Sequence, residues 1–598
     1  MKRVALIVAS IALTLSYPAM TLLAANGAGP SGSHHKWKFS PTINAPWALE
    51  DDQQPLDSPI LAAGLCRSSP FNTTGAYGTL VSNVDAIVGD AVNNSGFSNL
   101  GCTTPQNEAT IAVNPTNSSN LIVGANDYRV CCDSTGLNDS TGWAYYSFDG
   151  GQTWKNVQLP GLTAETGASG QLMKLDSAGD PVVTFSTDGV AYYANIAFSR
   201  VSPASAIVVS VSHDGGKTWS APNVIAFTDA GNFFNDKDWI AAGPNGKVAI
   251  TWTRFSLGPH GAGYLESPIV GALSKDYGKT WTRQGFPISD AAHPFDQGSQ
   301  VQFGADGALY VSYEAASPLT GYSTDAMVLA RSTDDGRSFQ TIELQRVYDD
   351  SDCYPIFGGR QTLTDMHFRI NSYPSMSIDQ STGQIWIVWT DDQGAGSCGS
   401  GGSSFAGTTS NQVKVINGTW PAIAGAKAGT ITPTTPDKVF PSVAALNGDW
   451  IVGYYTRDYG IFSTAPICNV QTNAAGGATI TPSPSPRPVC MDYALLGSTF
   501  GPQQGAIITS ESSNPFVQFA DGAFIGDYTQ VALVFDLRTG TTFGYAAWTD
   551  FRGNPGNDFR FPGVTPANQD VMVIPGFVLN CPPPDPSNPR CGVGPPSR

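Results

Sequence analysis

The sequence predicts an all-β fold, a β-propeller built from four-stranded antiparallel blades. A turn motif with the pattern Ser-x-Asp-x-Gly-x-Thr-Trp begins at residues 147, 212, 274 and 332. Pairs of apolar strands also recur along the chain at intervals of roughly 60–90 residues, as expected for a repeat architecture. Helical periodicity is nearly absent, so the strand pairs must supply the core. Together these observations predict blades arranged around an axis.

The turn motif can be explained residue by residue. The Asp carboxylate can accept hydrogen bonds from backbone N–H groups two or three residues further on, and Gly supplies a positive φ angle. Thr and Trp begin the next strand, with the indole packed against a neighbouring layer. Turn chemistry alone therefore accounts for the four copies, of which the last is degenerate: Ser147–Trp154, Ser212–Trp219, Ser274–Trp281 and Ser332–Phe339.

The strand pairs are interpreted as the two inner strands of each blade, and the turn motif as the outer hairpin of the first four. For the last three blades, outer strands are expected at 411–416, 492–497 and 570–578. Seven blades are favoured, with six as the alternative if the last long repeat folds otherwise. The strand pairs span residues 109–125, 171–188, 239–252, 300–314, 374–389, 441–455 and 525–548.

The chain is expected to be secreted, or to lie at the cell surface. Lys2 and Arg3, the apolar run after them and the small residues near Ala25 predict a cleaved signal peptide over 1–25, with an uncleaved anchor as the alternative. No other segment is apolar enough to span a bilayer. The net charge of −17 argues against nucleic acid as a partner. The 10 cysteines fit an oxidising compartment.

Four regions are expected along the chain: the signal peptide over 1–25, a partly irregular extension over 26–104, the propeller over 105–580 and a Pro-rich tail over 581–598. One or two strands are expected in the extension, within 78–88. Sequence proximity suggests the disulfides Cys468–Cys490 and Cys581–Cys591, and Cys353–Cys398 is a further candidate. The pairing of the other four stays open: Cys66, Cys102, Cys131 and Cys132.

The residues that flank the inner strand pairs should converge on one face, close to the propeller axis. Loops at such a face carry function on a rigid scaffold. Many of them are charged, although only 13% of the chain is. The alternative is that these charges pair between blades and close the ring. The positions are Glu108, Asn126, Asp127, Arg129, Asp188, Asp236, Lys237, Asp238, Arg254, Asp296, Glu314, Arg369, Tyr373, Asp391, Asp392, Asp437, Lys438, Arg457, Asp458, Asp527, Tyr528, Asp550 and Arg552.

The turn motif resembles the Asp-box, or BNR repeat, of the sialidase superfamily. The stretches 106–115, 525–528 and 548–552 also resemble secreted bacterial sialidase-like proteins, so that the resemblance covers roughly residues 105–578. It implies a β-propeller with the Asp-boxes at the blade periphery. It also implies an exo-acting glycoside hydrolase that removes terminal sialic acid, or a similar acidic sugar, from a glycan or glycoprotein.

The resemblance further implies three arginines that hold the substrate carboxylate, a Tyr nucleophile with a Glu, and an Asp acid/base. Phe368-Arg369-Ile370-Asn371 is the nearest match to the family's arginine motif, but Asn replaces Pro and the match follows the Asp-boxes. Arginine forks suit a carboxylate, and the candidates are Arg254, Arg369, Arg457 and Arg552. Asp391 is the acid/base candidate, and Tyr528 with Glu314 are the nucleophile and its base.

Two other functions remain open. The first is a non-catalytic propeller that binds a glycan or protein at the same face. The second is a glycosidase that uses two carboxylates, such as Asp236 with Asp391. No cofactor is required by either, but Asp349, Asp350 and Asp352, together with Asp365, offer the hard oxygen ligands that Ca²⁺ prefers. The alternative to a calcium site is a solvated acidic loop.

Overall fold

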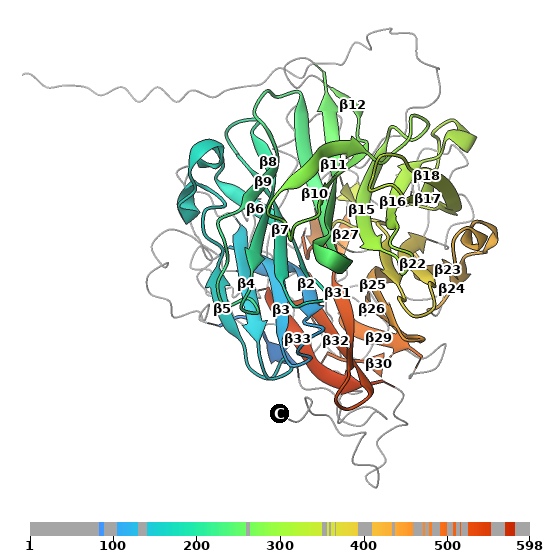
Figure 1. The fold of residues 1–598 in the computed structure, drawn as a ribbon. Coiled ribbons are helices and arrows are strands. Elements are labelled where there is room, and N and C mark those ends of the chain that lie inside the picture. The colour runs from blue at the N-terminus through green and yellow to red at the C-terminus, as the bar shows by residue number, and fades with distance from the viewer. Residues whose placement is uncertain are drawn as a thin grey trace, which may run out of the picture.

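The computed structural model (Figure 1) describes most of the predicted propeller. The signal peptide, all ten cysteines and the tail over 581–598 lie outside the described residues. The described residues are 83–88, 105–128, 140–258, 263–349, 354, 356–357, 360–364, 366, 368–392, 409–432, 437–457, 470–472, 478–480, 491–498, 506–509, 513, 515, 524–551 and 569–579.

Within these residues the chain forms seven blades of antiparallel strands, which confirms the predicted fold and the preferred blade number. Each of the first four blades starts at the axis and runs outward in chain order. Blade one contains β2 (Gln106–Val113), β3 (Leu121–Asp127), β4 (Thr141–Ser147) and β5 (Lys155–Gln158). Blade two contains β6 (Ser177–Phe185), β7 (Ala191–Phe198), β8 (Ser205–Ser212) and β9 (Asn223–Thr228).

Blade three has an additional short strand, β12 (Tyr264–Glu266), which pairs with its second strand. The path of blade three is β10 (Phe233–Ala242), β11 (Val248–Leu257), β13 (Ile269–Ser274) and β14 (Trp281–Pro287). Blade four contains β15 (Asp296–Phe303), β16 (Leu309–Ala316), β17 (Asp325–Ser332) and β18 (Gln340–Val347). Blade five contains β21 (Ser375–Ile378), β22 (Ile385–Asp392), β23 (Asn411–Gly418) and β24 (Gly429–Thr430).

The last two blades contain the outer strands that were expected near 492–497 and 570–578. Blade six contains β25 (Lys438–Leu446), β26 (Asp449–Thr456), β29 (Asp492–Gly497) and β30 (Ala506–Ile507). Blade seven contains β31 (Gln530–Asp536), β32 (Thr541–Asp550), β33 (Asp570–Val578) and, outermost, β1 (Val84–Asp85). Two small hairpins lie outside the blades: β19 (Ile356–Phe357) with β20 (Arg360–Gln361), and β27 (Val470–Thr472) with β28 (Ala478–Ile480).

The helical content of the described chain consists of short 3-10 turns. None of these helices is long and apolar enough to cross a membrane. One turn corrects a sequence prediction, because η4 (Gly170–Lys174) occupies the start of the strand pair expected over 171–188. That pair in fact consists of β6 and β7. The other turns are η3 (Ala164–Thr166), η5 (Pro244–Gly246), η7 (Pro318–Thr320) and η8 (Ala422–Gly425).

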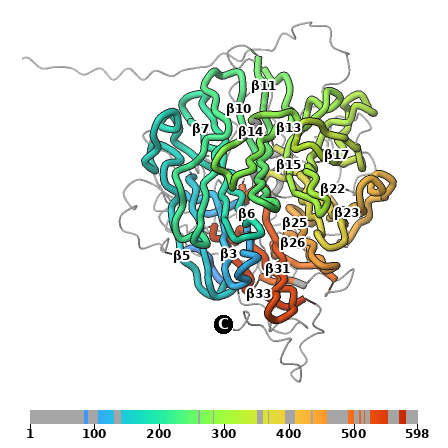
Figure 2. Tube along the Cα trace, in the orientation of Figure 1, coloured from blue at the N-terminus to red at the C-terminus, as the bar shows by residue number. Residues whose placement is uncertain are grey.

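The ring closes between the two ends of the described chain. β31 contacts both β25 and β2, so the innermost strand of blade seven lies beside that of blade one. Figure 2 shows blade seven, with the red β31 and β33, in the same part of the ring as blade one, with the blue β3. β1 precedes blade one in sequence but pairs with β33, where Val84 faces Val573. The segment before the first blade thus completes the last one.

The core lies between the blades, because each blade is covered by a neighbour on both faces. This explains near-continuous apolar runs such as 385–389, which an exposed sheet would not need. Trp252, Trp389 and Trp548 are fully buried on the second strands of blades three, five and seven. Trp548 stacks on Tyr493 of blade six, with ring centroids 5.2 Å apart, and so fastens two blades together.

The turn motif forms the expected tight turn at the outer edge of the blades. In the first copy, Asp149 accepts hydrogen bonds from the Thr153 backbone N–H at 2.9 Å and the Thr153 hydroxyl at 2.5 Å. The Asp contacts therefore lie three and four residues on, one residue further than expected. The degenerate copy makes the same bonds from Ser338 to Asp334. Phe339 in place of Trp therefore leaves the turn intact.

Candidate functional site

The axial face is shaped by irregularities in the inner strands. The strand register shifts near the start of β2, β6, β10, β15 and β25. A β-bulge of this kind redirects a side chain and is frequent next to active sites. At each shift one residue has a positive φ angle, which is uncommon for residues other than Gly. These residues are Glu108 (58°), Asp180 (49°), Lys237 (51°), Gly298 (67°) and Phe440 (52°).

Lys237 lies at the centre of this face. Its Nζ is 3.6 Å from Glu108 Oε1, 3.6 Å from Asp180 Oδ1 and 3.5 Å from Asp527 Oδ2. The side chain is 9% exposed, and Nζ lies 4.0 Å from the ring centroid of Tyr528. Burial alone would lower the pKa of Lys237, but the surrounding carboxylates raise it overall. The ammonium therefore stays charged and joins blades one, two, three and seven.

Glu108 and Asp180 form a carboxyl pair next to Lys237. Burial raises the pKa of both groups, Lys237 opposes that rise, and the two side chains lie within hydrogen-bonding reach of each other. Glu108 also accepts hydrogen bonds from Asn126 Nδ2 and from the Asp527 backbone N–H, both at 3.0 Å. This arrangement favours one proton held between the two carboxyl groups.

Asp527, unlike the Glu108–Asp180 pair, is held in the ionised state. Arg369 donates two hydrogen bonds of 2.9 Å to its two carboxylate oxygens. Burial would raise the pKa of Asp527, but Arg369 and then Lys237 hold it well below the usual range. Asn371 Nδ2 also donates to the Asp527 backbone carbonyl at 3.0 Å. Asp527 is therefore an oriented and permanently ionised carboxylate.

Asp236 is a further acid of the group. It is half-buried at the bulge of β10, and Gln297 Nε2 lies 3.4 Å from its Oδ2. Burial raises the pKa of Asp236, while Lys237 and Arg369 oppose that rise and Asp527 adds to it. Its neighbour Asp238 is 2% exposed, and burial raises the pKa of that carboxyl far above its usual range. Asp236 thus combines a raised pKa with a half-buried side chain.

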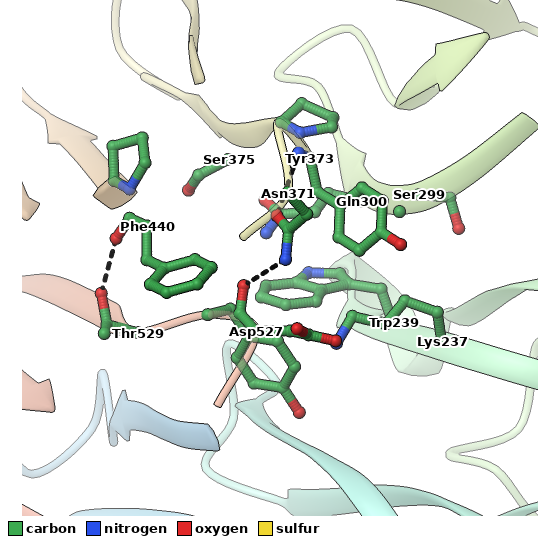
Figure 3. Close-up of a pocket in the computed structure, with 14 residues that line it drawn as sticks. Lys237, Trp239, Ser299, Gln300, Asn371, Tyr373, Ser375, Phe440, Asp527 and Thr529 are labelled. Atoms are coloured by element: carbon green, nitrogen blue, oxygen red, sulfur yellow. Dashed lines mark hydrogen bonds and ion pairs between the residues drawn. The ribbon is translucent and has the colours of Figure 1, made fainter. Parts of the chain in front are cut away.

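A small cavity of about 30 Å³ opens beside Lys237 and Asp527 (Figure 3). A volume of this size holds one or two waters, whereas pockets for whole ligands measure hundreds of Å³. Figure 3 shows the end of Lys237 directed at the Asp527 carboxylate. The lining combines aromatic rings with polar groups: Lys237, Trp239, Gly298, Ser299, Gln300, Asn371, Tyr373, Pro374, Ser375, Phe440, Pro441, Asp527, Tyr528 and Thr529.

The structure places the predicted nucleophile and its base in different surroundings. Tyr528 packs edge-on against Trp239, and its hydroxyl donates to the Pro181 carbonyl at 3.2 Å. Burial raises the pKa of Tyr528 well above its usual value. Glu314 lies instead on β16, with ligand oxygens of Asp325 and Asp349 within 4.8 Å. The contacts described for Tyr528 do not include Glu314, and the catalytic roles of both stay predictions.

The predicted arginines do not form one cradle in the described part of the chain. Arg369 holds Asp527, as described above. Arg254 lies over the Phe233 ring at 5.3 Å. Arg457 is buried and donates to Asp437 Oδ2 at 2.7 Å, which is an ion pair within blade six and not one between blades. Arg552 lies outside the described residues. None of the three described arginine side chains lines the cavity.

Asp391 lies on β22 in blade five, away from the lining of the cavity. Its oxygens accept from the Tyr348 backbone N–H at 3.0 Å and from Trp389 Nε1 at 3.4 Å. Burial raises the pKa of Asp391 to about 8, a value suited to proton transfer, so its acid/base role stays a prediction. Calcium at Asp349 likewise stays a prediction, because its partners Asp350, Asp352 and Asp365 lie outside the described residues.

The sequence predicted that Glu108, Asp236, Lys237 and Asp527 would reach this face, but it missed Asp180. The second strand pair was expected over 171–188, which placed Asp180 inside a hairpin. Pro181 was the available signal, because a proline within a strand often marks a bulge. In the structure Gly179 precedes and Val182 follows the register shift. The bulge brings the Asp180 carboxylate to Lys237.

Comparisons with known proteins found similar solved structures at low sequence identity. No protein-family model and no curated protein matches the chain. A Dyadobacter fermentans protein of unknown function has 14% identity and a TM-score of 0.38, covering 59% of this chain and 91% of its own. An alpha-L-arabinanase from Penicillium chrysogenum, complexed with arabinobiose, has 15% identity and a TM-score of 0.37, covering 66% and 92%.

A Trypanosoma rangeli sialidase is also among the similar structures, with 12% identity and a TM-score of 0.34 over 59% of this chain and 53% of its own. The structural neighbours thus include glycoside hydrolases that act on different sugars. Similarity this low says nothing about the activity of this chain.

Proposed function

We propose that the protein is a glycoside hydrolase whose axial carboxyl groups act as acid and charge stabiliser. The observation that carries the proposal is the opposite pKa shift of two neighbouring carboxyl groups, raised for Asp236 and lowered for Asp527. Environments that push two carboxyl pKa values apart assign one group as the acid and the other as the permanent anion. Such pairs at an accessible face are typical of functional sites.

In this proposal each group has a separate task. The Asp236 carboxyl donates its proton to the glycosidic oxygen as the bond between that oxygen and the anomeric carbon breaks. The ionised Asp527 stabilises the positive charge that develops on the sugar. A water oxygen then bonds to the anomeric carbon, and the proton that this water releases restores Asp236. Arg369 keeps Asp527 oriented through its two hydrogen bonds.

Release of terminal sialic acid is the narrower form of the proposal, carried over from the sequence resemblance. It needs arginines that can hold the substrate carboxylate. Arg369 instead donates two hydrogen bonds to the Asp527 carboxylate, and Arg457 is paired with Asp437. The substrate would be a glycan or glycoprotein met outside the cell, in keeping with the predicted signal peptide. Sialosides therefore belong in the test as one substrate class among several.

A second candidate function is a non-catalytic propeller that binds a glycan at the same face. The observation that favours it is the size of the cavity, since about 30 Å³ admits a substituent and not a sugar ring. A lectin-like protein needs only such a shallow contact with an exposed sugar. It requires no carboxyl group with a raised pKa, so replacement of Asp236 would leave turnover absent and binding largely unchanged.

The deciding experiment is hydrolysis of a panel of aryl glycosides, sialosides included, by residues 26–598. We expect turnover of at least one substrate and a loss of about 100-fold or more in the Asp236→Asn variant, as is usual for a missing general acid. Asp229→Asn is the matched control, because Asp229 is exposed and pairs only with exposed Lys174 in the described contacts. Full activity in Asp236→Asn would refute the assignment, and no turnover by folded wild type would favour the binding function.

A further inference from the structure

The cavity is lined by the charged ammonium group of Lys237, which makes no direct hydrogen bond to the described residues. Lys237 is 7% exposed, and its Nζ has no hydrogen-bond partner among the described residues. The three carboxylate oxygens around it stand at 3.5–3.6 Å, whereas charged N–H···O hydrogen bonds measure about 2.7–2.9 Å. A buried ammonium in this position can still donate a hydrogen bond to a group that enters the cavity.

We infer that this cavity accepts a hydroxyl or hydroxymethyl group, so that the sugar bound at the axial face is a neutral one. A hydroxyl group can accept a hydrogen bond from Lys237 and donate one to Asp527, and both residues line the cavity. A volume of about 30 Å³ matches one or two heavy atoms. The inference uses the site of the proposed function and adds its substrate class.

A carboxylate fits the same cavity poorly. It would lie beside the ionised Asp527, and it has no proton to donate to that group. The positive charge of Lys237 is already balanced by the ionised Asp527 and by the Glu108–Asp180 pair, which holds one proton between two carboxyl groups. Nearby Arg369 is likewise matched by Asp527. The charges at the cavity therefore select against an acidic sugar.

The aromatic lining agrees with a sugar substituent. Trp239 and Tyr528 form one edge-on pair with ring centroids 6.1 Å apart, and Tyr373 and Phe440 line the cavity with them. Aromatic rings supply apolar contact area for C–H groups next to a hydroxyl. Gly298 lets the Tyr373 ring pack directly on the backbone, because a Cβ there would lie 2.3 Å from that ring. The cavity thus suits a small group that carries a hydroxyl on a C–H carbon, such as a hydroxymethyl group.

Calorimetric binding of free sugars tests the inference without requiring turnover. The probes are glucose, galactose, xylose and arabinose as neutral sugars, and N-acetylneuraminic acid as the acidic one. We expect at least one neutral sugar to bind, no measurable binding of the acidic sugar, and a loss of about tenfold or more in Lys237→Met, as for a lost charged hydrogen bond. Lys174→Met is the control, because Lys174 is 56% exposed.

Three results would overturn the inference: binding of the acidic sugar alone, binding of no sugar, or a neutral sugar that binds Lys237→Met as tightly as wild type. If Lys237→Met does not fold, the comparison of neutral and acidic sugars on wild type still decides. Binding and hydrolysis are measured separately. Neutral-sugar binding without turnover would contradict the proposed hydrolase and leave this inference standing. Turnover of sialosides alone would support the proposed hydrolase and contradict this inference.

Discussion

The pKa values of individual residues at the axial face depend more on burial than on their neighbours in sequence. Asp391 gives a test of this view, because burial raises its pKa to about 8 while its unfolded value is about 3.9. The folded protein therefore holds this proton more tightly than the unfolded chain does. The stability gained from it is complete below about pH 4 and is lost as the pH rises through about 8.

We predict that the free energy of unfolding of wild type falls between about pH 5 and pH 9 by more than that of Asp391→Asn, which cannot titrate. Urea denaturation at the two pH values measures both. The Asn variant keeps an oxygen for the Tyr348 N–H, so its folding is a fair expectation. Parallel pH curves for the two proteins would show that Asp391 does not carry a raised pKa.

At the scale of elements, the outer turns and the inner bulges have separate tasks. The turn at Asp214 accepts the Thr218 backbone N–H at 2.9 Å and the Thr218 hydroxyl at 2.6 Å, and Trp219 Nε1 donates to Gly216 at 3.1 Å. These contacts are local, and they lie in the turn between β8 and β9, the two outer strands of blade two, whereas the axial cavity lies at the inner strands. Their loss should affect stability and leave the axial chemistry alone.

We predict that Asp214→Ala lowers the free energy of unfolding by about 1–2 kcal/mol through lost hydrogen bonds, without changing turnover or sugar binding. Chemical denaturation and the glycoside assay measure the two effects. Asp229→Ala serves as the control, since an exposed ion pair contributes less than about 1 kcal/mol. A loss of activity in a stably folded Asp214→Ala protein would contradict the division between turn and site.

The elements also show how far the sequence alone could lead. The outer turns and the apolar strand pairs could be predicted from the sequence, because each depends on residues close together in the chain. The bulges at Glu108, Asp180 and Lys237 were not, because a positive φ at a charged residue is imposed by packing around the axis. The sequence therefore predicted that Glu108, Lys237 and Asp527 reach the axial face, but it missed Asp180 and wrongly placed Asp188 there, which lies in the turn between β6 and β7. It could not predict that Arg369 would pair with Asp527, from a different blade.

At the scale of the whole molecule, the ring depends on a segment that precedes its first blade. β1 pairs with β33, Ala86 N donates to Val571 O at 2.9 Å, and Ala86 and Ile87 are buried. Asn156 of blade one donates to the Ala86 carbonyl at 3.0 Å. The segment 83–88 therefore joins blade seven to blade one from the outside.

We predict that a chain beginning at residue 89 melts at a lower temperature than one beginning at residue 83, because only the longer chain retains β1 and its buried neighbours. Thermal unfolding followed by circular dichroism compares the two. The chain that begins at 83 is the matched control and should melt close to the chain that begins at 26. Equal melting temperatures for the chains that begin at 83 and 89 would show that β1 contributes nothing to ring closure.

If Asp236 acts as a protonated acid beside an ionised Asp527, the pH dependence of kcat/KM for a hydrolysed glycoside must show both groups. Because the pKa of Asp236 is raised, activity should persist above the usual carboxyl range and fall as the pH rises through that raised value. Because the pKa of Asp527 is lowered, no loss is expected on the acidic side until well below about pH 4. The alkaline fall should disappear in Asp236→Asn, together with most of the activity. A kcat/KM that rises with pH, with a pH profile of the same shape in Asp236→Asn, would contradict the role of Asp236 as the acid.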